Sequence, residues 1–167
     1  LKSVVDKIKS IVQVGLSRDF FRLITCSMGM LAYADPNVEV VYLNPDTDNE
    51  LLGKSVRYAM QQSKVVGFDE FQKIFHSGVI EKREAEWEAF AMQKYGYKTR
   101  RAMYSSYATC VVSSDGEQIE IQPTSRKSMD SFTASKDTGP HALYFSFSIT
   151  DEEFGIALRE AFENCTG

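Results

Sequence analysis

The sequence predicts an α+β fold in which helices pack on a mainly antiparallel sheet. Several strand-like runs follow one another along the chain instead of alternating singly with helices, which favours strands joined by hairpins. One pair of runs flanks Asp115-Gly116, and Asp-Gly in that position is a strong hairpin signal. A unit made of a strand, a capping residue and an amphipathic helix occurs twice. No linker-like stretch divides the chain, so we expect residues 1–167 to form a single domain.

The first copy of the repeated unit spans residues 48–60, and the second spans residues 150–162, 102 positions later. In the first copy the apolar residues Leu52, Val56 and Met60 follow the spacing of one helix face, and the second copy repeats that spacing. We therefore expect each helix to bury this apolar stripe. Four positions are identical in the two copies: Glu50/Glu152, Gly53/Gly155, Arg57/Arg159 and Ala59/Ala161.

Each copy also begins with residues that can cap a helix. Asp48 or Thr47 can cap the first copy, and Thr150 with Glu153 has the form of a capping box. Two interpretations remain open for the repeat. The copies are two ordinary, well-capped amphipathic helices, or the trace of an ancient duplication or family signature, and the two interpretations are compatible because a signature can be purely structural.

The shared glycines and arginines carry two further expectations. Glycine within a helix costs up to about 1 kcal/mol relative to alanine. We therefore expect Gly53 and Gly155 to allow the close approach of a neighbouring strand. Arg57 and Arg159 lie one position past the apolar stripe, so we expect them at its rim.

The elements of the first half follow from the same patterns. Residues 1–14 place apolar side chains between Lys and Asp, which predicts an amphipathic helix that ends near Gly15. Three strands are expected next, at residues 19–27, 30–33 and 38–43. A turn at residues 35–37 should precede the last of them. After the first repeated helix, which should end near Ser63, two more helices are expected at residues 68–76 and 79–95.

The second half reads mainly as strands. Residues 98–104 are basic and are expected to be extended. The Asp-Gly hairpin should join strands at 107–112 and 117–122, and the polar stretch 123–140 should hold an excursion or a short edge strand. Residues 143–149 alternate cleanly between apolar and polar side chains, which predicts a strand before the second repeated helix.

The charge is uneven along the chain. The net charge is −4, but residues 23–53 contain no Lys, Arg or His, and residues 151–167 contain five acids and one Arg. An acidic face repels nucleic acid and attracts a basic partner. The acids of the first block are Asp35, Glu39, Asp46, Asp48 and Glu50.

The sequence offers little for catalysis. It contains no phosphate-binding loop, dinucleotide fingerprint or nucleophile elbow, and we expect no cofactor. The three widely spaced cysteines form neither a disulfide framework nor a zinc pattern, so we expect small buried thiols and no metal. No apolar run approaches the ~20 residues of a membrane span, so we expect no membrane partner.

Two other functional hypotheses remain open. A small regulatory or nucleic-acid-binding module could use the basic residues Arg100, Arg101, Arg126 and Lys127. An enzyme could instead assemble a nucleophilic pair from Cys110 and His141. For the basic residues we favour pairing with the acidic blocks, and any chain with three cysteines and two histidines offers pairs of the second kind.

The repeated unit also carries a resemblance to a known family. The family's motif is a strand followed by Asp/Thr-x-x-x-Leu-Gly-x-Ala-Leu/Val-Arg-x-Ala-Leu, where x is any residue. Residues 150–162 match this motif, and residues 48–60 match it more loosely. Residues 119–123 also fit the strand of the pattern. In these residues the chain resembles one group of immunity proteins from bacterial contact-dependent growth inhibition systems. Phe154 and Phe162 stand where leucines are more usual in that group. The resemblance covers about half of the chain.

The resemblance implies a non-enzymatic protein of the cytoplasm that binds one cognate toxin domain, and such toxins are commonly nucleases. It names no contact residues. A nuclease that grips phosphates presents Lys and Arg, so an acidic face could occupy that surface and speed the encounter. We therefore expect Asp35, Glu39, Asp46, Asp48 and Glu50 to contact the toxin. Simple capping and solubility remain the alternative roles of these acids.

Overall fold

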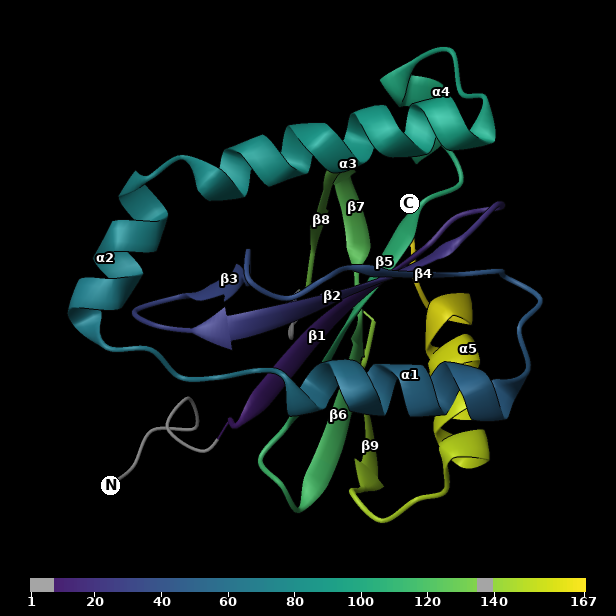
Figure 1. Ribbon diagram of the computed structural model, residues 1–167. Coiled ribbons are helices and arrows are strands. Elements are labelled where there is room, and N and C mark those ends of the chain that lie inside the picture. Colours follow the sequence, from purple (N-terminus) through teal and green to yellow (C-terminus); the bar gives the residue numbers. More distant parts are fainter. Residues whose placement is uncertain (1–7, 135–139) are drawn as a thin grey trace.

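The protein is an antiparallel sheet with helices on both faces (Figure 1). The computed structural model describes residues 8–134 and 140–167. The main sheet has seven strands in the order β3-β2-β1-β5-β6-β9, and β4 also pairs with β2. Its strands are β1 (Ser10–Leu16), β2 (Phe21–Met28), β3 (Ala32–Ala34), β4 (Val41–Leu43), β5 (Ala108–Ser114), β6 (Gln118–Pro123) and β9 (Leu143–Ser146). The expected α+β class is confirmed.

Helices α1 and α5 cover one face of the sheet and α3 covers the other (Figure 1). The helices are α1 (Asn49–Gln61), α2 (Phe68–His76), α3 (Val79–Tyr95), α4 (Arg100–Tyr104) and α5 (Asp151–Glu163). The bounds expected for α2 and α3 are those observed. Within the described residues, no helix has the length and apolar content that crossing a membrane requires.

Strand β2 contributes side chains to both faces of the sheet. Phe21 and Leu23 belong to the core beneath α1 and α5, whereas Arg22 and Ile24 line a recess beside α3. Successive side chains of a strand point to opposite faces. Because β2 is buried on both faces, all but its last residue is buried, and its sequence reads as a continuous run instead of an alternating one.

The hairpin around Asp115-Gly116 forms as expected and joins β5 to β6. Gly116 adopts a positive φ of 94°, and the Asp115 carboxylate accepts hydrogen bonds from the backbone N–H groups of Glu117 and Gln118, at 2.9 and 2.8 Å. The strands then pair with Val112 opposite Ile121. This pairing places Ile119 and Ile121 in the core, as the alternation of the sequence predicts.

The helix expected at residues 1–14 is wrong over the described part. Ser10–Leu16 is strand β1, which pairs with β2 on one side and β5 on the other. Val12 and Val14 are fully buried beneath α1 and α5. Alternation and helical spacing overlap in so short an apolar segment, and pairing on both sides selects the strand. Residues 1–7 lie outside the described residues.

The extended segment expected at 98–104 is also wrong, because Arg100–Tyr104 is the short helix α4. Thr99 caps it, since its Oγ1 accepts a hydrogen bond from the backbone N–H of Ala102 at 3.0 Å. This turn buries Met103 and Tyr104 against α3. The capping signal was present at Thr99, but the basic residues after it favoured a different interpretation.

The polar stretch 123–140 contains a small hairpin of its own. Strands β7 (Ser125–Ser128) and β8 (Ser131–Thr133) pair with each other in a separate two-stranded sheet. Residues 135–139 of the expected excursion lie outside the described residues. Strand β9 ends at Ser146, three residues before the expected strand end at 149, because Phe147 to Ile149 turn towards the start of α5.

Candidate functional site

The two repeated helices pack directly on each other through their glycines. A Cβ atom on Gly53 would overlap the carbonyl oxygen of Asp151, and one on Gly155 would overlap the carbonyl oxygen of Asn49. The close neighbour of each glycine is therefore the start of the other helix, not the strand that we expected. Since each contact is the counterpart of the other, α1 and α5 approach symmetrically at their first turns.

Arg57 forms the first of two equivalent sets of hydrogen bonds, in each of which an arginine of one repeated helix binds the start of the other; we call each set a clasp. Its Nε donates to the Asp151 carboxylate at 2.9 Å, and its two Nη atoms donate to the carbonyl oxygens of Phe147 and Ile149, at 2.8 and 2.6 Å. The guanidinium thus holds the segment that leads into α5. Arg57 is half-buried at the edge of the apolar stripe, as expected, and its three N–H groups are all engaged by the carboxylate and the two carbonyls.

Arg159 forms the second clasp with equivalent atoms. Its Nε donates to the Asn49 side chain at 2.8 Å, one Nη donates to the Pro45 carbonyl at 2.9 Å, and the other donates to the Thr47 carbonyl. Pro45, Thr47 and Asn49 occupy the same positions relative to the start of α1 that Phe147, Ile149 and Asp151 occupy relative to the start of α5. Both arginines are half-buried at the edge of the apolar stripe, as expected, but the sequence did not indicate their hydrogen-bond partners. A common ancestry of the two units remains a hypothesis.

The clasp of Arg159 forms the floor of an acidic recess of about 510 Å³, lined by residues 45–50, Glu152 and Arg159. Within the described residues, the carboxylates of Asp46, Glu50 and Glu152 make no hydrogen bond or ion pair, and all three side chains are exposed. The positive guanidinium below them is engaged with carbonyl and amide oxygens. The surface presented to solvent is therefore anionic.

The structure brings three of the five expected contact residues together at this recess: Asp46, Asp48 and Glu50. Asp48 has a second task, because its Oδ1 accepts the backbone N–H of Leu51 at 2.7 Å and caps α1. Glu152 was missing from the expected set. The repeat could have supplied it, since Glu152 is the counterpart of Glu50.

Asp35 is separated from the other acids by its burial. Only 3% of it is exposed, and its carboxylate accepts hydrogen bonds from the Ser27 hydroxyl at 2.6 Å and the Asn37 backbone N–H at 2.9 Å. A carboxylate held in this way stabilises the turn between β3 and β4, although Asp35 also lines the recess beside α3. Its burial favours a structural role, and the contact with the toxin expected for Asp35 stays an untested prediction.

We expect Asp35→Asn to lower the free energy of unfolding by about 1 kcal/mol, because the neutral amide weakens both charge-assisted hydrogen bonds while keeping the shape of the side chain. Urea denaturation followed by circular dichroism measures this change. Glu39→Gln removes one charge from an exposed side chain and should alter stability by less than about 0.5 kcal/mol. Equal effects of the two changes would contradict the role given to Asp35.

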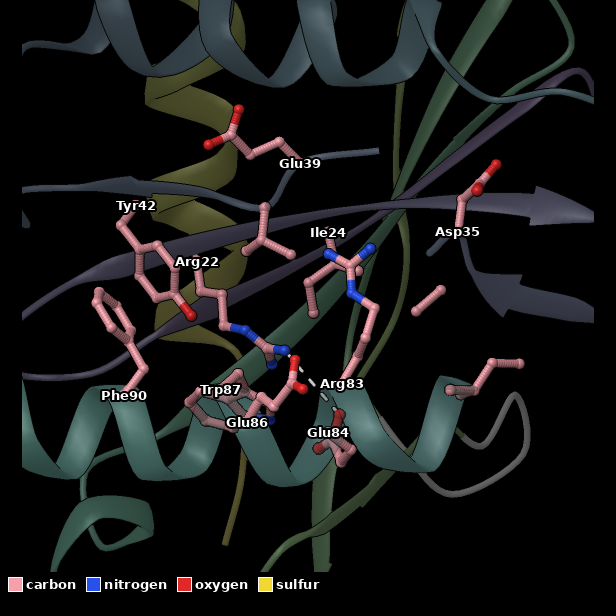
Figure 2. Close-up of a pocket in the computed structure, with 13 residues that line it drawn as sticks. Arg22, Ile24, Asp35, Glu39, Tyr42, Arg83, Glu84, Glu86, Trp87 and Phe90 are labelled. Atoms are coloured by element: carbon pink, nitrogen blue, oxygen red, sulfur yellow. Dashed lines mark ion pairs between the residues drawn. The ribbon is translucent and has the colours of Figure 1, made fainter. Parts of the chain in front are cut away.

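Glu39 lines a second recess, of about 350 Å³, between α3 and the sheet (Figure 2). Arg22 of β2 rises from its floor, with the guanidinium carbon 3.7 Å from the ring centre of Trp87. Glu84 lies 4.0 Å from this guanidinium. Glu86 also lines the recess, so carboxylates and apolar walls surround one buried cation.

Two N–H donors in this second recess have no hydrogen-bond acceptor within the described residues, namely Arg22 Nε and Trp87 Nε1. A buried donor without an acceptor costs about 1–3 kcal/mol. The indole face of Trp87 offsets part of that cost for the guanidinium through a cation–π contact. Arg83 stabilises one wall of the recess, because it donates hydrogen bonds to the carbonyl oxygens of Pro36 and Val38.

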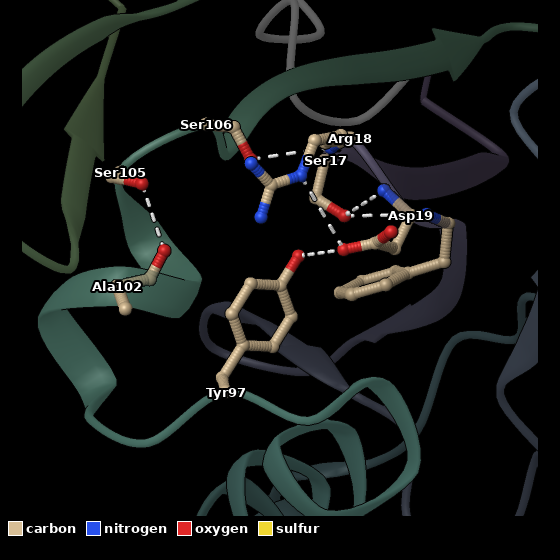
Figure 3. Close-up of polar contacts among 8 residues, drawn as sticks. Ser17, Arg18, Asp19, Tyr97, Ala102, Ser105 and Ser106 are labelled. Atoms are coloured by element: carbon tan, nitrogen blue, oxygen red, sulfur yellow. Dashed lines mark hydrogen bonds and ion pairs between the residues drawn. The ribbon is translucent and has the colours of Figure 1, made fainter.

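A polar cluster connects the turn between β1 and β2 to the segments on either side of α4, through Tyr97 before it and Ser106 after it (Figure 3). The Tyr97 hydroxyl donates to the Asp19 carboxylate, and the Ser17 hydroxyl accepts the backbone N–H groups of Asp19 and Phe20 at 3.1 and 3.2 Å. Burial and the contact with Asp19 raise the pKa of Tyr97. A tyrosine kept neutral and bonded in this way holds the turn in place and supplies no reactive base.

The structure disfavours the nucleic-acid hypothesis. Arg100 pairs with Glu88 and with Asp130, the latter at 2.7 Å. Arg126 donates to the carbonyl oxygens of Met129, Tyr104 and Tyr107, at 2.6, 2.7 and 2.7 Å. Two of the four basic residues are therefore engaged within the protein, and only Arg101 and Lys127 remain as exposed cations without such partners within the described residues.

The structure also gives no support to the nucleophilic pair. Cys110 is fully buried, and its polar contact is the Cys165 thiol, whereas His141 is exposed and lines a shallow recess with Gln122 and Tyr144. The hydrogen bond to Cys165 and burial raise the pKa of Cys110, which disfavours its thiolate. Within the described residues, no group of three or more His, Cys, Asp or Glu side chains could hold a metal ion.

Comparison with known proteins relates the whole fold to one family. A sequence model of the CDI immunity proteins matches residues 10–165. Immunity protein CdiI-YPIII of Yersinia pseudotuberculosis serotype O:3 (strain YPIII) is 26% identical over 177 residues, which cover 97% of this chain and 99% of that protein.

Two solved structures share the fold. A protein of unknown function from Neisseria meningitidis superposes with a TM-score of 0.85 and 25% identity over 93% of this chain and 94% of its own. A chain in the CdiA-CT/CdiI toxin and immunity complex from Yersinia pseudotuberculosis superposes with a TM-score of 0.82 and 24% identity over 93% of this chain and 97% of its own.

Proposed function

Because the chain belongs to the family of contact-dependent growth inhibition (CDI) immunity proteins, we propose that it binds and neutralises the toxin domain of its own CDI system. The observation that carries this proposal is the family match over residues 10–165, which takes in the sheet and both repeated helices. The similar Yersinia chain comes from a complex of a toxin with its immunity protein, which supports the same role.

We propose that the toxin contacts the acidic recess and also Glu39, which lines the second recess. Asp46, Asp48, Glu50 and Glu152 present carboxylates around the paired starts of α1 and α5. The two clasped helices hold these side chains on a rigid base, so binding would order few groups that are mobile beforehand. Asp35 is not included in this proposed surface because its side chain is buried.

The chemistry of this surface suits a basic partner, and we propose a nuclease toxin. A protein that grips phosphates must present Lys or Arg at its active site, and an anionic surface can occupy that site in place of the nucleic acid. The protein would then act in the cytoplasm as a stoichiometric, non-enzymatic inhibitor. Turnover of a substrate by the purified protein alone would contradict this role.

The acidic surface is tested by the triple change Glu39→Lys, Asp46→Lys and Glu50→Lys. We expect the dissociation constant for the cognate toxin domain to rise more than about tenfold at low salt, or roughly 1.4 kcal/mol, because attraction becomes repulsion. Asp48 is left unchanged because it caps α1. Calorimetry or surface plasmon resonance at two salt concentrations measures the effect, which should shrink as salt rises.

A matched control makes the same change in net charge elsewhere. Glu70, Glu117 and Glu163 are exposed and lie outside both recesses, and replacing all three with lysine should leave toxin affinity within about threefold. If the two triple variants weaken binding equally, the effect belongs to net charge, and the acidic recess is not the contact surface. If neither weakens it, the toxin binds elsewhere.

A further inference from the structure

Two free thiols meet where the end of α5 packs on the sheet. Cys110 lies in β5 and is fully buried, and Cys165 follows α5 and is partly exposed. Their Sγ atoms are 3.7 Å apart. The third cysteine, Cys26, is buried in β2, and its polar contact is the Ile24 carbonyl.

Cys165 opens into a recess of about 180 Å³, whose lining includes Thr124 and Arg126. The backbone after α5 is held there, because the Thr166 N–H donates to the Thr124 carbonyl at 3.2 Å and the Arg126 N–H donates to the Thr166 carbonyl at 2.9 Å. The segment that carries Cys165 is thus anchored beside β5. One thiol of the pair can be reached by a small molecule while the other is enclosed behind it.

The two thiols differ in acidity in a way that fits this placement. The hydrogen bond from Cys110 lowers the pKa of Cys165, although burial acts against that shift. The same bond, together with burial, raises the pKa of Cys110. Burial raises the pKa of Cys26 to about 11. In its thiol form Cys165 can also donate to the Thr109 carbonyl, at 3.3 Å. The partly exposed Cys165 is therefore the thiol that ionises most readily of the three.

We propose that Cys165 is an oxidation site for small hydroperoxides and that Cys110 resolves the product as an intramolecular disulfide. The Cys165 thiolate attacks one peroxide oxygen, the O–O bond breaks, and the departing hydroxide takes up the proton that Cys165 released and becomes water. The thiol sulfur of Cys110 then attacks the resulting sulfenic sulfur. The S–S bond forms, the S–O bond breaks, and the hydroxide leaves as water with the Cys110 proton.

The balance of the two steps is complete. Two thiols lose two electrons and two protons in total, and one hydrogen peroxide is reduced to two waters. The product ties the end of α5 to β5 across the long stretch of chain between residues 110 and 165. A cross-link over a loop of this length restricts the unfolded chain far more than the folded one, so oxidation should stabilise the protein.

The test exposes the reduced full chain to hydrogen peroxide at about pH 7.5, near the ordinary pKa of a thiol. We expect peptide mapping to show one disulfide joining Cys110 to Cys165 with the loss of two hydrogens, and Cys26 still alkylatable. The melting temperature should rise by about 5 °C or more and return after dithiothreitol. Size-exclusion chromatography should show no covalent dimer.

Two variants separate the steps. In Cys110→Ser the sulfenic acid should persist at Cys165 and be trapped by dimedone, whereas in Cys165→Ser peroxide should leave Cys110 reduced. If a variant does not fold, peptide mapping of the unaltered protein still decides. Retention of both thiols in the unaltered protein, or a disulfide that involves Cys26 or a second molecule, would overturn the proposal. Toxin affinity plays no part in this readout, so its outcome is independent of the proposed function.

Discussion

Gly155→Ala is expected to lower the free energy of unfolding by about 3 kcal/mol, because the added methyl group would overlap the backbone carbonyl of Asn49. A carbonyl at the start of a helix cannot swing aside as a flexible side chain can. The helices must separate instead, and separation loosens the packing of Phe154 and Leu158 in the core. The gain of up to about 1 kcal/mol in helix propensity offsets only part of this loss.

Gly53→Ala should have a similar effect, since its Cβ would overlap the carbonyl of Asp151. The same separation of the helices relieves both overlaps, so the double variant should cost less than the sum of the single variants. Gly67→Ala is the control, because nothing lies within 4 Å of a Cβ there. Urea denaturation measures all four proteins. A loss at Gly155 no greater than that at Gly67 would show that the helices do not meet as described.

Arg159→Lys is expected to cost about 2–3 kcal/mol of stability despite keeping the charge. The planar guanidinium reaches Asn49, Pro45 and Thr47 with three separate N–H groups. One ammonium group cannot serve the three acceptors at once, so half-buried carbonyl groups lose their donors. Thermal and urea unfolding should both report the loss.

Arg101→Lys supplies the comparison for this change. Arg101 is exposed and makes no hydrogen bond or ion pair within the described residues, so the substitution should alter stability by less than about 0.5 kcal/mol. A small loss of stability in Arg159→Lys would mean that water donates hydrogen bonds to these carbonyls as well as the guanidinium does. Arg57→Lys should behave as Arg159→Lys does, because Arg57 holds the equivalent segment before α5.

Local sequence patterns predicted much of the fold. The α+β class, the hairpin at Asp115-Gly116 and the bounds of α2 and α3 each follow from turn chemistry or periodicity within about twenty residues. The errors at β1 and α4 have a different origin. The segment 10–16 is a strand because β2 and β5 flank it, and β5, which is distant in sequence, leaves no mark on the pattern of residues 10–16.

The candidate site was predictable only in part, for a similar reason. The sequence showed that acids cluster before α1, but not that Asp35 is enclosed while Asp46 and Glu50 remain free. Burial depends on what packs against a residue from elsewhere in the chain. Glu152 joins the recess because α5 lies against α1, and only the likeness between the two copies pointed to it.

The two arginine clasps have a consequence for how the protein is made. Each joins residues 90 or more positions apart, so neither clasp can form until the ribosome has synthesised both halves of the chain. Contacts of such high contact order form late and make folding slow. A chain that is still being synthesised would contain Asp46 and Glu50 before Arg159 is available to bind the segment that leads into α1. If the chain acts as proposed, a fragment that ends before α5 would hold the acids of the recess without the Arg159 clasp and should protect the cell poorly.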